Sequence, residues 1–136
     1  MNIDKFKHQH EKIYACIDAL RRHANSGIAE NASEIAGLVV SMSSLIKLHL
    51  AVEDKVLYPA LRSSQDSALA KAGEAYQAEM AEIAASYDDF ARKWNTAANV
   101  KRHPEGFRAD ANTVLKTLYQ RIRREDRDFY PAVEAA

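Results

Sequence analysis

The stretch His49-Leu-Ala-Val-Glu53-Asp54-Lys-Val-Leu-Tyr58-Pro59-Ala60 returns later in the chain as Arg121-Ile-Arg-Arg-Glu125-Asp126-Arg-Asp-Phe-Tyr130-Pro131-Ala132. Glu, Asp, Tyr, Pro and Ala match at the same offsets in the two copies. In a helix, His49 and Glu53 lie one turn apart on the same face, where an imidazole and a carboxylate can bind one metal ion. The second copy has Arg121 in place of the histidine, and a guanidinium cannot bind a metal. The repeat therefore indicates a metal site of which one half has been altered.

Four long runs of apolar residues at heptad spacing predict four amphipathic helices, and only four Gly and three Pro are present to interrupt them. We expect these helices over about residues 3–24, from Asn31 to about Pro59, from the end of segment 63–66 to Trp94, and from Pro104 to Pro131. Asn31 with Glu34 three residues later fits a capping arrangement. Short loops between long helices favour antiparallel neighbours. The predicted fold class is all-α: a single domain over residues 1–136, built as an up-down-up-down antiparallel four-helix bundle.

Polar residues interrupt the apolar seams of these helices at one common height. Each residue adds about 1.5 Å of rise to a helix, so positions equally far from the same end of the bundle form one layer. Seven residues fall in that layer: His10, His49, Glu53, Tyr76, Met80, Arg121 and Glu125. The other seam positions are mostly apolar, as at Ile13 and Val56, so chance is a poor explanation for the layer. We expect its side chains to coordinate an ion or to pair with one another.

The composition argues against several classes of function. Lys plus Arg and Asp plus Glu number 19 each, so no net field draws the chain to nucleic acid or to an anionic membrane. Local basic clusters at residues 101–103 and 121–127 are interpreted as solvated faces. Cys16 is the single cysteine, no leader opens the chain, and no apolar run approaches the roughly 18 residues that span a bilayer. We expect a cytoplasmic protein without nucleic-acid or membrane partners, and leave a protein partner open.

These motifs resemble the hemerythrin family, in its bacterial HHE cation-binding form, over nearly the whole chain. His10-Glu11-Lys12-Ile13 resembles the first-helix histidine motif, and His49 to Pro59 resembles the second-helix HxxxE motif with its Tyr-Pro end. The resemblance implies a hemerythrin-like four-helix bundle in which five histidines and two carboxylates hold a pair of irons, where oxygen is bound or sensed. By position, the family ligands correspond to His10, His49, Glu53 and Glu125.

Three of the histidines that the resemblance implies are replaced in this chain. The third-helix pair falls on Tyr76 and Met80, or on Met80 and Ala84 in an alternative register, and the fourth-helix histidine falls on Arg121. Two imidazoles and two carboxylates can coordinate one ion, but two irons would lack donors on one side. We therefore expect either no metal or a single iron or zinc ion, and not a full di-iron centre.

Arg121 suggests a substitute for the missing metal. We expect its guanidinium to fork between Glu53 and Glu125, while the Tyr76 hydroxyl and the two imidazoles satisfy the remaining lone pairs. No nucleophile with an adjacent base, phosphate-binding loop or Cys-x-x-Cys pair is present, so an enzyme is not expected. The main hypothesis is a binding or regulatory module that has lost oxygen binding and uses its polar layer as a structural plug. The alternative is a metal-binding protein with a mononuclear site for metal storage, or for sensing oxygen or nitric oxide.

Overall fold

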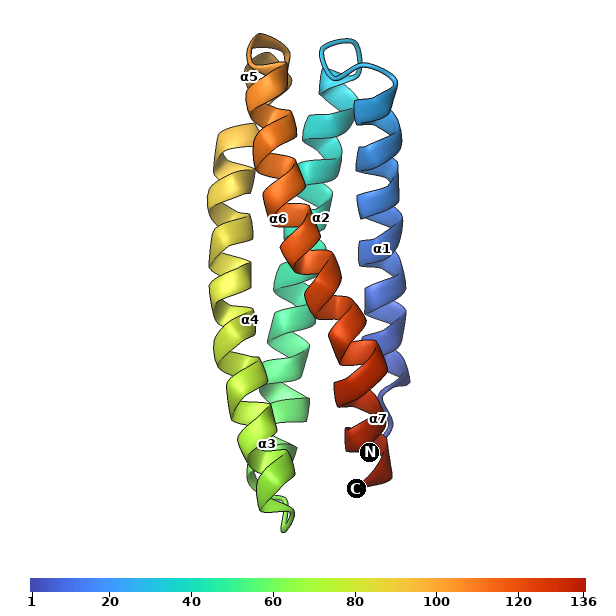
Figure 1. Ribbon diagram of the computed structural model, residues 1–136, viewed down its shortest axis with the longest axis vertical. Coiled ribbons are helices and arrows are strands. Elements are labelled where there is room, and N and C mark those ends of the chain that lie inside the picture. Colours follow the sequence, from blue (N-terminus) through green and yellow to red (C-terminus); the bar gives the residue numbers. More distant parts are fainter.

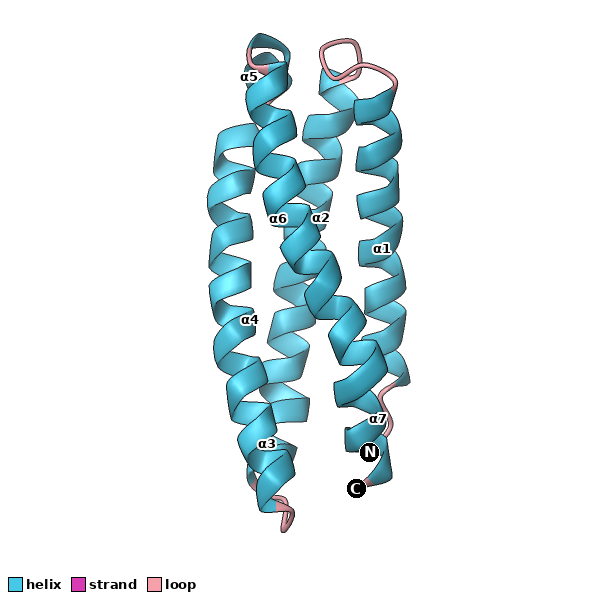
Figure 2. Cartoon of the chain, viewed as in Figure 1, coloured by secondary structure: helices cyan, strands magenta, loops and turns pink.

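The computed structural model describes residues 1–136, and the chain is all-helical, with no strand. Long helical rods lie side by side, and loops occur only near the ends of these rods (Figures 1 and 2). The rods are formed by α1 (Asp4–Asn25); by α2 (Ala32–Val52), η1 (Glu53–Leu57) and α3 (Tyr58–Arg62); by α4 (Ser67–Trp94); and by α6 (Pro104–Arg124), η2 (Glu125–Phe129) and α7 (Tyr130–Ala135). A short helix, α5 (Ala97–Arg102), lies between the third and fourth expected helices. Both termini lie at the same end of the molecule (Figure 1).

The helix ends follow local chemistry at some positions and differ from expectation at others. Asp66 caps α4, because its side chain accepts a hydrogen bond from the Leu69 backbone N–H at 3.1 Å. Gly27 follows α1 with a φ of +119°, a conformation that glycine adopts without steric cost. Asn31 does precede α2, but the expected cap is wrong: its amide instead donates to the carbonyls of Gly27 and His23. The Asn31 side chain therefore ties the loop before α2 to the end of α1 through two backbone carbonyls.

Two π-helices, η1 and η2, interrupt the second and fourth rods at equivalent points of the repeat. In each, the N–H of the motif tyrosine bonds to a carbonyl five residues earlier: Tyr58 to Glu53, and Tyr130 to Glu125. Proline lacks an N–H and crowds the carbonyl four residues before it, and the wider turn accommodates the proline that follows each tyrosine. The prediction that the second helix ends close to Pro59 is confirmed, because its rod ends at Arg62, but the fourth rod does not close at Pro131 and continues to Ala135.

The wider turns also change which side chains face the core. An uninterrupted α-helical seam predicted Val56 on the inner stripe, but this residue is 51% exposed. Leu57 and Tyr58 are both fully buried instead, as are Phe129 and Tyr130 in the second copy. Two consecutive residues can face inward because the extra residue in a π-turn rotates the register. Each motif tyrosine is thereby directed into the bundle.

A polar layer divides the apolar core into two clusters. The larger cluster fills most of the bundle, and its buried members include Ile13, Ile17, Ile35, Met42, Met80, Tyr87, Trp94, Phe107 and Leu118. The smaller cluster lies toward the termini and contains Ile3, Phe6, Leu57, Tyr58, Leu61, Leu69, Phe129, Tyr130 and Val133. Burial of these side chains supplies the main favourable free energy of folding. The layer between them is therefore enclosed by apolar side chains on both sides.

The second rod is long and apolar enough, by length and composition, to cross a membrane. Within Ala32–Arg62, an 18-residue window has a mean hydropathy of 1.8, and 33% of it is buried. The expectation that no apolar stretch approaches this length is wrong, because Lys47 and His49 interrupt the run without making it polar on average. One such helix is weak evidence for a membrane span, since the core helix of a bundle meets the same criteria. Here the helix carries His49 and Glu53 into the polar layer.

Candidate metal centre

All buried polar side chains of the chain belong to the layer between the two apolar clusters. They are Gln9 and His10 from α1, His49 from α2, Glu53 from η1, Arg121 from α6 and Glu125 from η2. Of these, His10, His49, Glu53 and Glu125 are fully buried. Residues more than a hundred positions apart in the sequence thus meet at one height, as the seam comparison predicted. A set of this size needs internal partners or an ion, because burying unpaired charge is costly.

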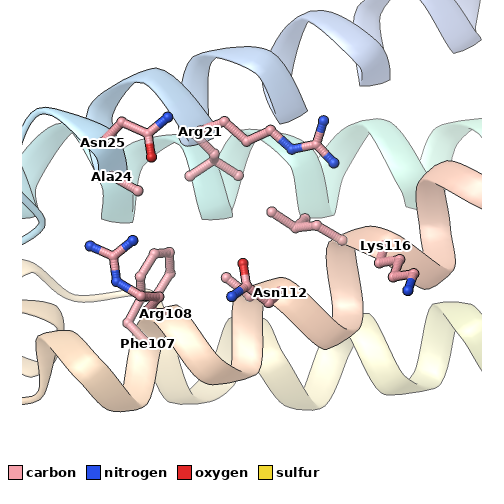
Figure 3. A pocket seen from close by; sticks show the side chains of 10 residues that line it. Arg21, Ala24, Asn25, Phe107, Arg108, Asn112 and Lys116 are labelled. Carbon is pink, nitrogen blue, oxygen red and sulfur yellow. The ribbon is translucent and has the colours of Figure 1, made fainter.

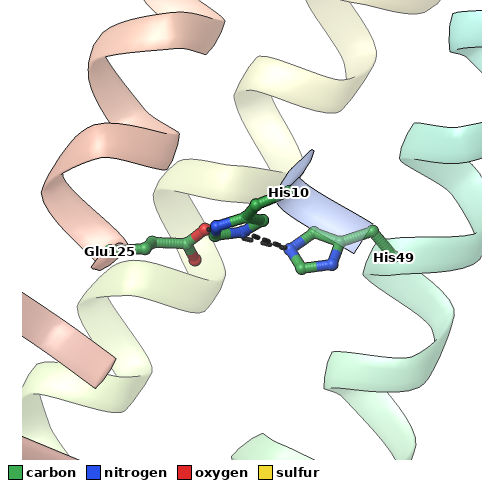
Figure 4. Close-up of side chains that lie close together, drawn as sticks. All are labelled: His10, His49 and Glu125. Carbon is green, nitrogen blue, oxygen red and sulfur yellow. Dashed lines mark hydrogen bonds and ion pairs between the residues drawn. The ribbon is translucent and has the colours of Figure 1, made fainter. Parts of the chain in front are cut away.

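The two imidazoles are oriented so that their Nε2 atoms face each other. His10 Nδ1 lies 2.7 Å from a carboxylate oxygen of Asp126, and His49 Nδ1 lies 2.7 Å from the side-chain oxygen of Gln9. Both oxygens accept, so each Nδ1 is the donor and each Nε2 keeps the lone pair when the ring is neutral. The two Nε2 atoms are 3.0 Å apart (Figure 4). Orientation of a histidine ligand by a carboxylate or amide behind it is typical of metal sites.

Two carboxylate oxygens complete the group. Glu125 Oε1 lies 3.1 Å from His10 Nε2 and 3.8 Å from His49 Nε2, and Glu53 Oε1 lies 3.4 Å from His49 Nε2. The ligand atoms of His10, His49 and Glu125 all lie within 4.8 Å of one another. Four donors about 2.0–2.1 Å from a zinc-sized ion in a tetrahedral shell would be about 3.3 Å apart. The spacing of His10, His49 and Glu125 is therefore compatible with one ion, and Glu53 adjoins this group of three through His49.

While the two Nε2 atoms are unprotonated, the inward carboxylate oxygens Glu53 Oε1 and Glu125 Oε1 are buried without a hydrogen-bond donor. Protonation of His10 turns its Nε2 into a donor to Glu125 Oε1, 3.1 Å away. The other oxygen of Glu53 accepts from the Tyr130 hydroxyl at 2.9 Å, and the other oxygen of Glu125 accepts from Arg121 at 3.2 Å. The unsatisfied oxygens face the two Nε2 atoms described above. Buried acceptors of this kind are normally satisfied, so the centre of the group fits a cation. The donor set, two imidazoles and two carboxylates, suits iron or zinc.

The pKa values of the layer show how strongly its charges interact. Burial alone would lower the pKa of His10, but hydrogen bonds to Asp126 and Glu125 raise it to about 9. Burial lowers the pKa of His49. Burial and the charge of Glu125 raise the pKa of Glu53 to about 8. Burial also acts to raise the pKa of Glu125. Hydrogen bonds with both histidines and the charge of Arg121 outweigh burial and hold this pKa far below the usual range. Without metal, a proton on His10 serves as the positive charge of the group.

Arg121 lies in the layer but does not make the fork that the sequence suggested. Its guanidinium donates to Glu125 at 3.2 Å, to Glu79 at 3.1 Å and to the Tyr76 backbone carbonyl at 2.7 Å. It makes no hydrogen bond or ion pair with Glu53, whose partner is Tyr130. The expected role of the Tyr76 hydroxyl is also wrong, because Tyr76 offers its carbonyl and its ring, 4.6 Å from the Arg121 guanidinium carbon. Arg121 therefore balances the negative charge of Glu125 through Oε2, the carboxylate oxygen that does not face the two histidines.

The remaining predicted position, Met80, is not part of the polar layer. It is 1% exposed and belongs to the larger apolar cluster, where a flexible thioether fills space. Sequence reasoning missed Gln9, Asp126, Tyr130 and Glu79, all of which contact the group or its arginine. Asp126 and Tyr130 recur in the repeat and could have been found from it. Gln9 and Glu79 carry no such signal, because nothing in the sequence distinguishes them from exposed polar residues.

The comparison with protein-family models agrees with this geometry. The model described as the hemerythrin HHE cation binding domain matches residues 1–133. This chain belongs to the hemerythrin HHE family. The resemblance drawn from the two motifs is confirmed, and the all-helical fold is the one expected for a hemerythrin-type domain. A comparison with curated proteins and one with solved structures gave no match.

Proposed function

We propose that this protein is a hemerythrin-type up-down-up-down four-helix bundle that binds one divalent cation, iron or zinc, in its polar layer. The ligands are His10, His49, Glu53 and Glu125. The observation that carries the proposal is the pair of buried, unsatisfied oxygens on Glu53 and Glu125 facing two imidazole nitrogens. A cation at that point satisfies four lone pairs at once. When bound, the ion supplies a fixed positive charge that ties α1, α2 and the two π-helices together.

A second cation is disfavoured by the charge of Arg121. Its guanidinium is 1% exposed and contacts Glu125, the carboxylate that a second ion on that side would need. An arginine keeps its proton in proteins, so a second divalent ion would be repelled at short range. We therefore propose that the di-iron centre implied by the family has been replaced by one metal ion and one guanidinium. Oxygen chemistry that depends on two irons is lost with it.

The function that follows is binding or regulation, without catalysis. Four protein ligands fill a tetrahedral shell and leave no open position for a substrate, as in structural metal sites. The ligands are fully buried, so substrate has no contact with them. In this proposal metal binding stabilises the folded bundle. The stability of the domain therefore changes with the amount of metal available in the cell.

A metal-free layer acting as a structural plug is the second candidate. It is favoured by the raised pKa of His10, because a proton held there to about pH 9 supplies the positive charge that a metal would otherwise bring. In that case Arg121 and protonated His10 together balance Glu125 and Asp126. The two candidates differ in whether a cation binds with useful affinity at neutral pH.

Metal titration of the tag-free chain distinguishes the two candidates. The protein is stripped with chelator and titrated with Zn²⁺ and, without oxygen, with Fe²⁺, and bound metal is counted by elemental analysis. We expect one ion per chain, and His49→Ala should weaken binding by at least about tenfold, in line with the sensitivity of metal sites to lost ligand interactions. Glu53→Gln should weaken it similarly. The matched control is His8→Ala on α1, the helix of His10, because the His8 imidazole is exposed, with a side-chain exposure of 67%.

Two results would contradict the proposal. Two irons per chain with an oxo-bridge absorption band would show that the di-iron centre persists beside Arg121. No bound metal, with the natural chain and the His49→Ala variant behaving alike, would favour the metal-free plug.

A further inference from the structure

A groove between α4 and α6 leads from the surface to the buried arginine of the polar layer. Its walls carry small hydroxyl and amide side chains, among them Ser86, Thr117 and Gln120. Two arginines, Arg121 and Arg124, also line it. Arg121 is the single lining residue that is buried, so it forms the floor, while the others are exposed or half-buried. The groove thus offers a polar path to a guanidinium.

The two guanidiniums of the groove converge on one carboxylate oxygen. Arg121 donates to Glu79 Oε1 at 3.1 Å, and Arg124 donates to the same oxygen. Both guanidiniums also lie against the Tyr76 ring, 4.6 Å and 5.3 Å from its centroid. Contact with the same aromatic ring restricts their relative position. The result is a preformed pair of donors whose geometry suits a carboxylate.

Glu79 is held less firmly than the arginines around it. Its side chain is 44% exposed, and both of its hydrogen bonds use the same oxygen. Half-exposed ion pairs contribute little net stability. Below it, Arg121 Nε is buried and has no hydrogen-bond partner. Arg121 therefore keeps one buried donor unsatisfied, and the Glu79 carboxylate that pairs with it can turn into solvent. Both features indicate that Glu79 does not fully satisfy the two arginines.

The cations of another pocket do not show this convergence. The pocket between α1 and α6 is lined by Arg21, Arg108 and Lys116 around an apolar floor that includes Phe107. Figure 3 shows the charged ends of Arg21 and Arg108 on opposite sides of that pocket. They share no carboxylate and no aromatic face. The groove between α4 and α6 is therefore the better candidate for binding an anion.

We propose that the α4–α6 groove binds a small, polar organic carboxylate between Arg121 and Arg124, in the place that Glu79 occupies. Glu79 then acts as a tethered competitor that swings into solvent when the ligand enters. The planar, two-donor geometry of the guanidinium pair selects a carboxylate, and the hydroxyl and amide walls select a polar body. Arg121 also donates to Glu125, so the occupied groove borders the metal layer. The proposal holds for metal-free protein and does not depend on metal binding.

The test is calorimetric titration of the metal-free, tag-free full chain with malonate and, separately, with inorganic phosphate. The natural chain should bind malonate. Glu79→Ala should bind it at least about tenfold more tightly, because a tethered competitor acts at millimolar effective concentration. The matched control is Glu82→Ala in the same groove, since Glu82 forms no hydrogen bond or ion pair with either arginine, and this variant should change affinity by less than about twofold. Arg124→Gln should weaken binding by about tenfold or more, as for loss of a charged hydrogen bond.

Arg124 is suited to this test because its side chain is 41% exposed, so the variant keeps the core intact; helical circular dichroism checks this. The proposal is overturned if the natural chain or the Glu79→Ala variant binds no malonate. It is also overturned if Glu82→Ala gains as much affinity as Glu79→Ala, since the effect would then be general charge. Phosphate binding as tight as malonate binding would contradict the selection of a carboxylate, and unchanged affinity in Arg124→Gln would contradict the site.

Discussion

Tyr58 and Tyr130 occupy the same position in the two copies of the repeat but differ in what their hydroxyls contact. The Tyr130 hydroxyl donates to Glu53 at 2.9 Å and lies 3.2 Å from His10 Nε2. The Tyr58 hydroxyl is buried with no partner. The two hydroxyls differ because His10 and Glu53 lie within reach of the Tyr130 hydroxyl, whereas the Tyr58 hydroxyl has no partner within reach. Tyr58 can therefore serve as the control when the contribution of the Tyr130 hydroxyl to stability is measured.

Removing the two hydroxyls should have different effects. Tyr130→Phe leaves a buried Glu53 oxygen without its donor and should lower the free energy of unfolding of the metal-free chain by about 1–3 kcal/mol. Tyr58→Phe removes a hydroxyl that has no partner and should change it by no more than about 0.5 kcal/mol. Urea denaturation at neutral pH measures both. Equal losses in the two variants would mean that Tyr130 contributes packing alone.

At individual residues, the sequence predicted which ionisable groups meet but not how they pair. His10, His49, Glu53 and Glu125 could be placed in one layer because their spacing from the helix ends is regular. The partner of Arg121 could not, because Glu79 lies beside the predicted seam of Tyr76 and Met80. A side chain as long as arginine reaches past the seam to a flanking carboxylate, and heptad spacing does not describe that reach.

Among the elements, helix existence was predictable and the two π-turns were not. Cap and stop residues such as Asp66 and Gly27 act over a few residues, so local sequence marks them. Pro59 and Pro131 signal a helix end equally well by the same reasoning, yet both rods continue beyond them. Residues after each proline, such as Leu61 and Val133, pack in the smaller apolar cluster, and this packing stabilises the continued helix. That contribution is tertiary, and the local sequence does not reveal it.

Glycines in two helices test how closely the elements pack. Gly37 in α2 is exposed, and a methyl group there meets nothing within 4 Å, so Gly37→Ala should raise the free energy of unfolding by about 1 kcal/mol. In α4 a methyl at Gly73 would lie 2.9 Å from Leu61 Cδ1 and 3.3 Å from Leu61 Cβ. Overpacking costs about 1–3 kcal/mol, so Gly73→Ala should gain nothing or lose stability. Thermal denaturation compares them; a similar gain in both variants would show that α3 packs loosely on α4.

For the whole molecule, the polar layer makes stability depend on pH. His10 has a pKa raised to about 9 and Glu53 one raised to about 8, so each folded group binds its proton more tightly than the unfolded chain does. Their stabilisation is complete below the unfolded values and is lost as pH rises through the folded ones. His49 and Glu125 have lowered pKa values, so their stabilisation is lost as pH falls. Stability of the metal-free chain should therefore be highest at mildly acidic pH, between the ordinary values of 4.5 for Glu53 and 6.5 for His10, and should decline on both sides.

The alkaline side of this profile distinguishes the metal-free chain from the metal-loaded one. Between neutral pH and the Glu53 pKa of about 8, both protons are linked to folding, and the metal-free chain should lose roughly 2–3 kcal/mol per pH unit. From there to the His10 pKa of about 9, the loss should be on the order of 1 kcal/mol per pH unit. A bound cation takes the place of the proton, so the loaded chain should stay level over the same interval. Urea denaturation at several pH values, with and without Zn²⁺, measures this. A flat profile without metal would mean that the His10 proton does not stabilise the fold.

Both chain termini lie at the end of the bundle that holds the smaller apolar cluster, next to the polar layer (Figure 1). Any peptide fused to either terminus is consequently placed beside the candidate metal ligands. A polyhistidine purification tag would bring a local excess of competing imidazoles to that end, and it would distort metal counts most at substoichiometric metal. An affinity handle inserted in the loop around Gly27, at the opposite end, keeps such imidazoles a full bundle length away. The same arrangement would let a donor and acceptor fluorophore on the two termini report directly on the packing of this end.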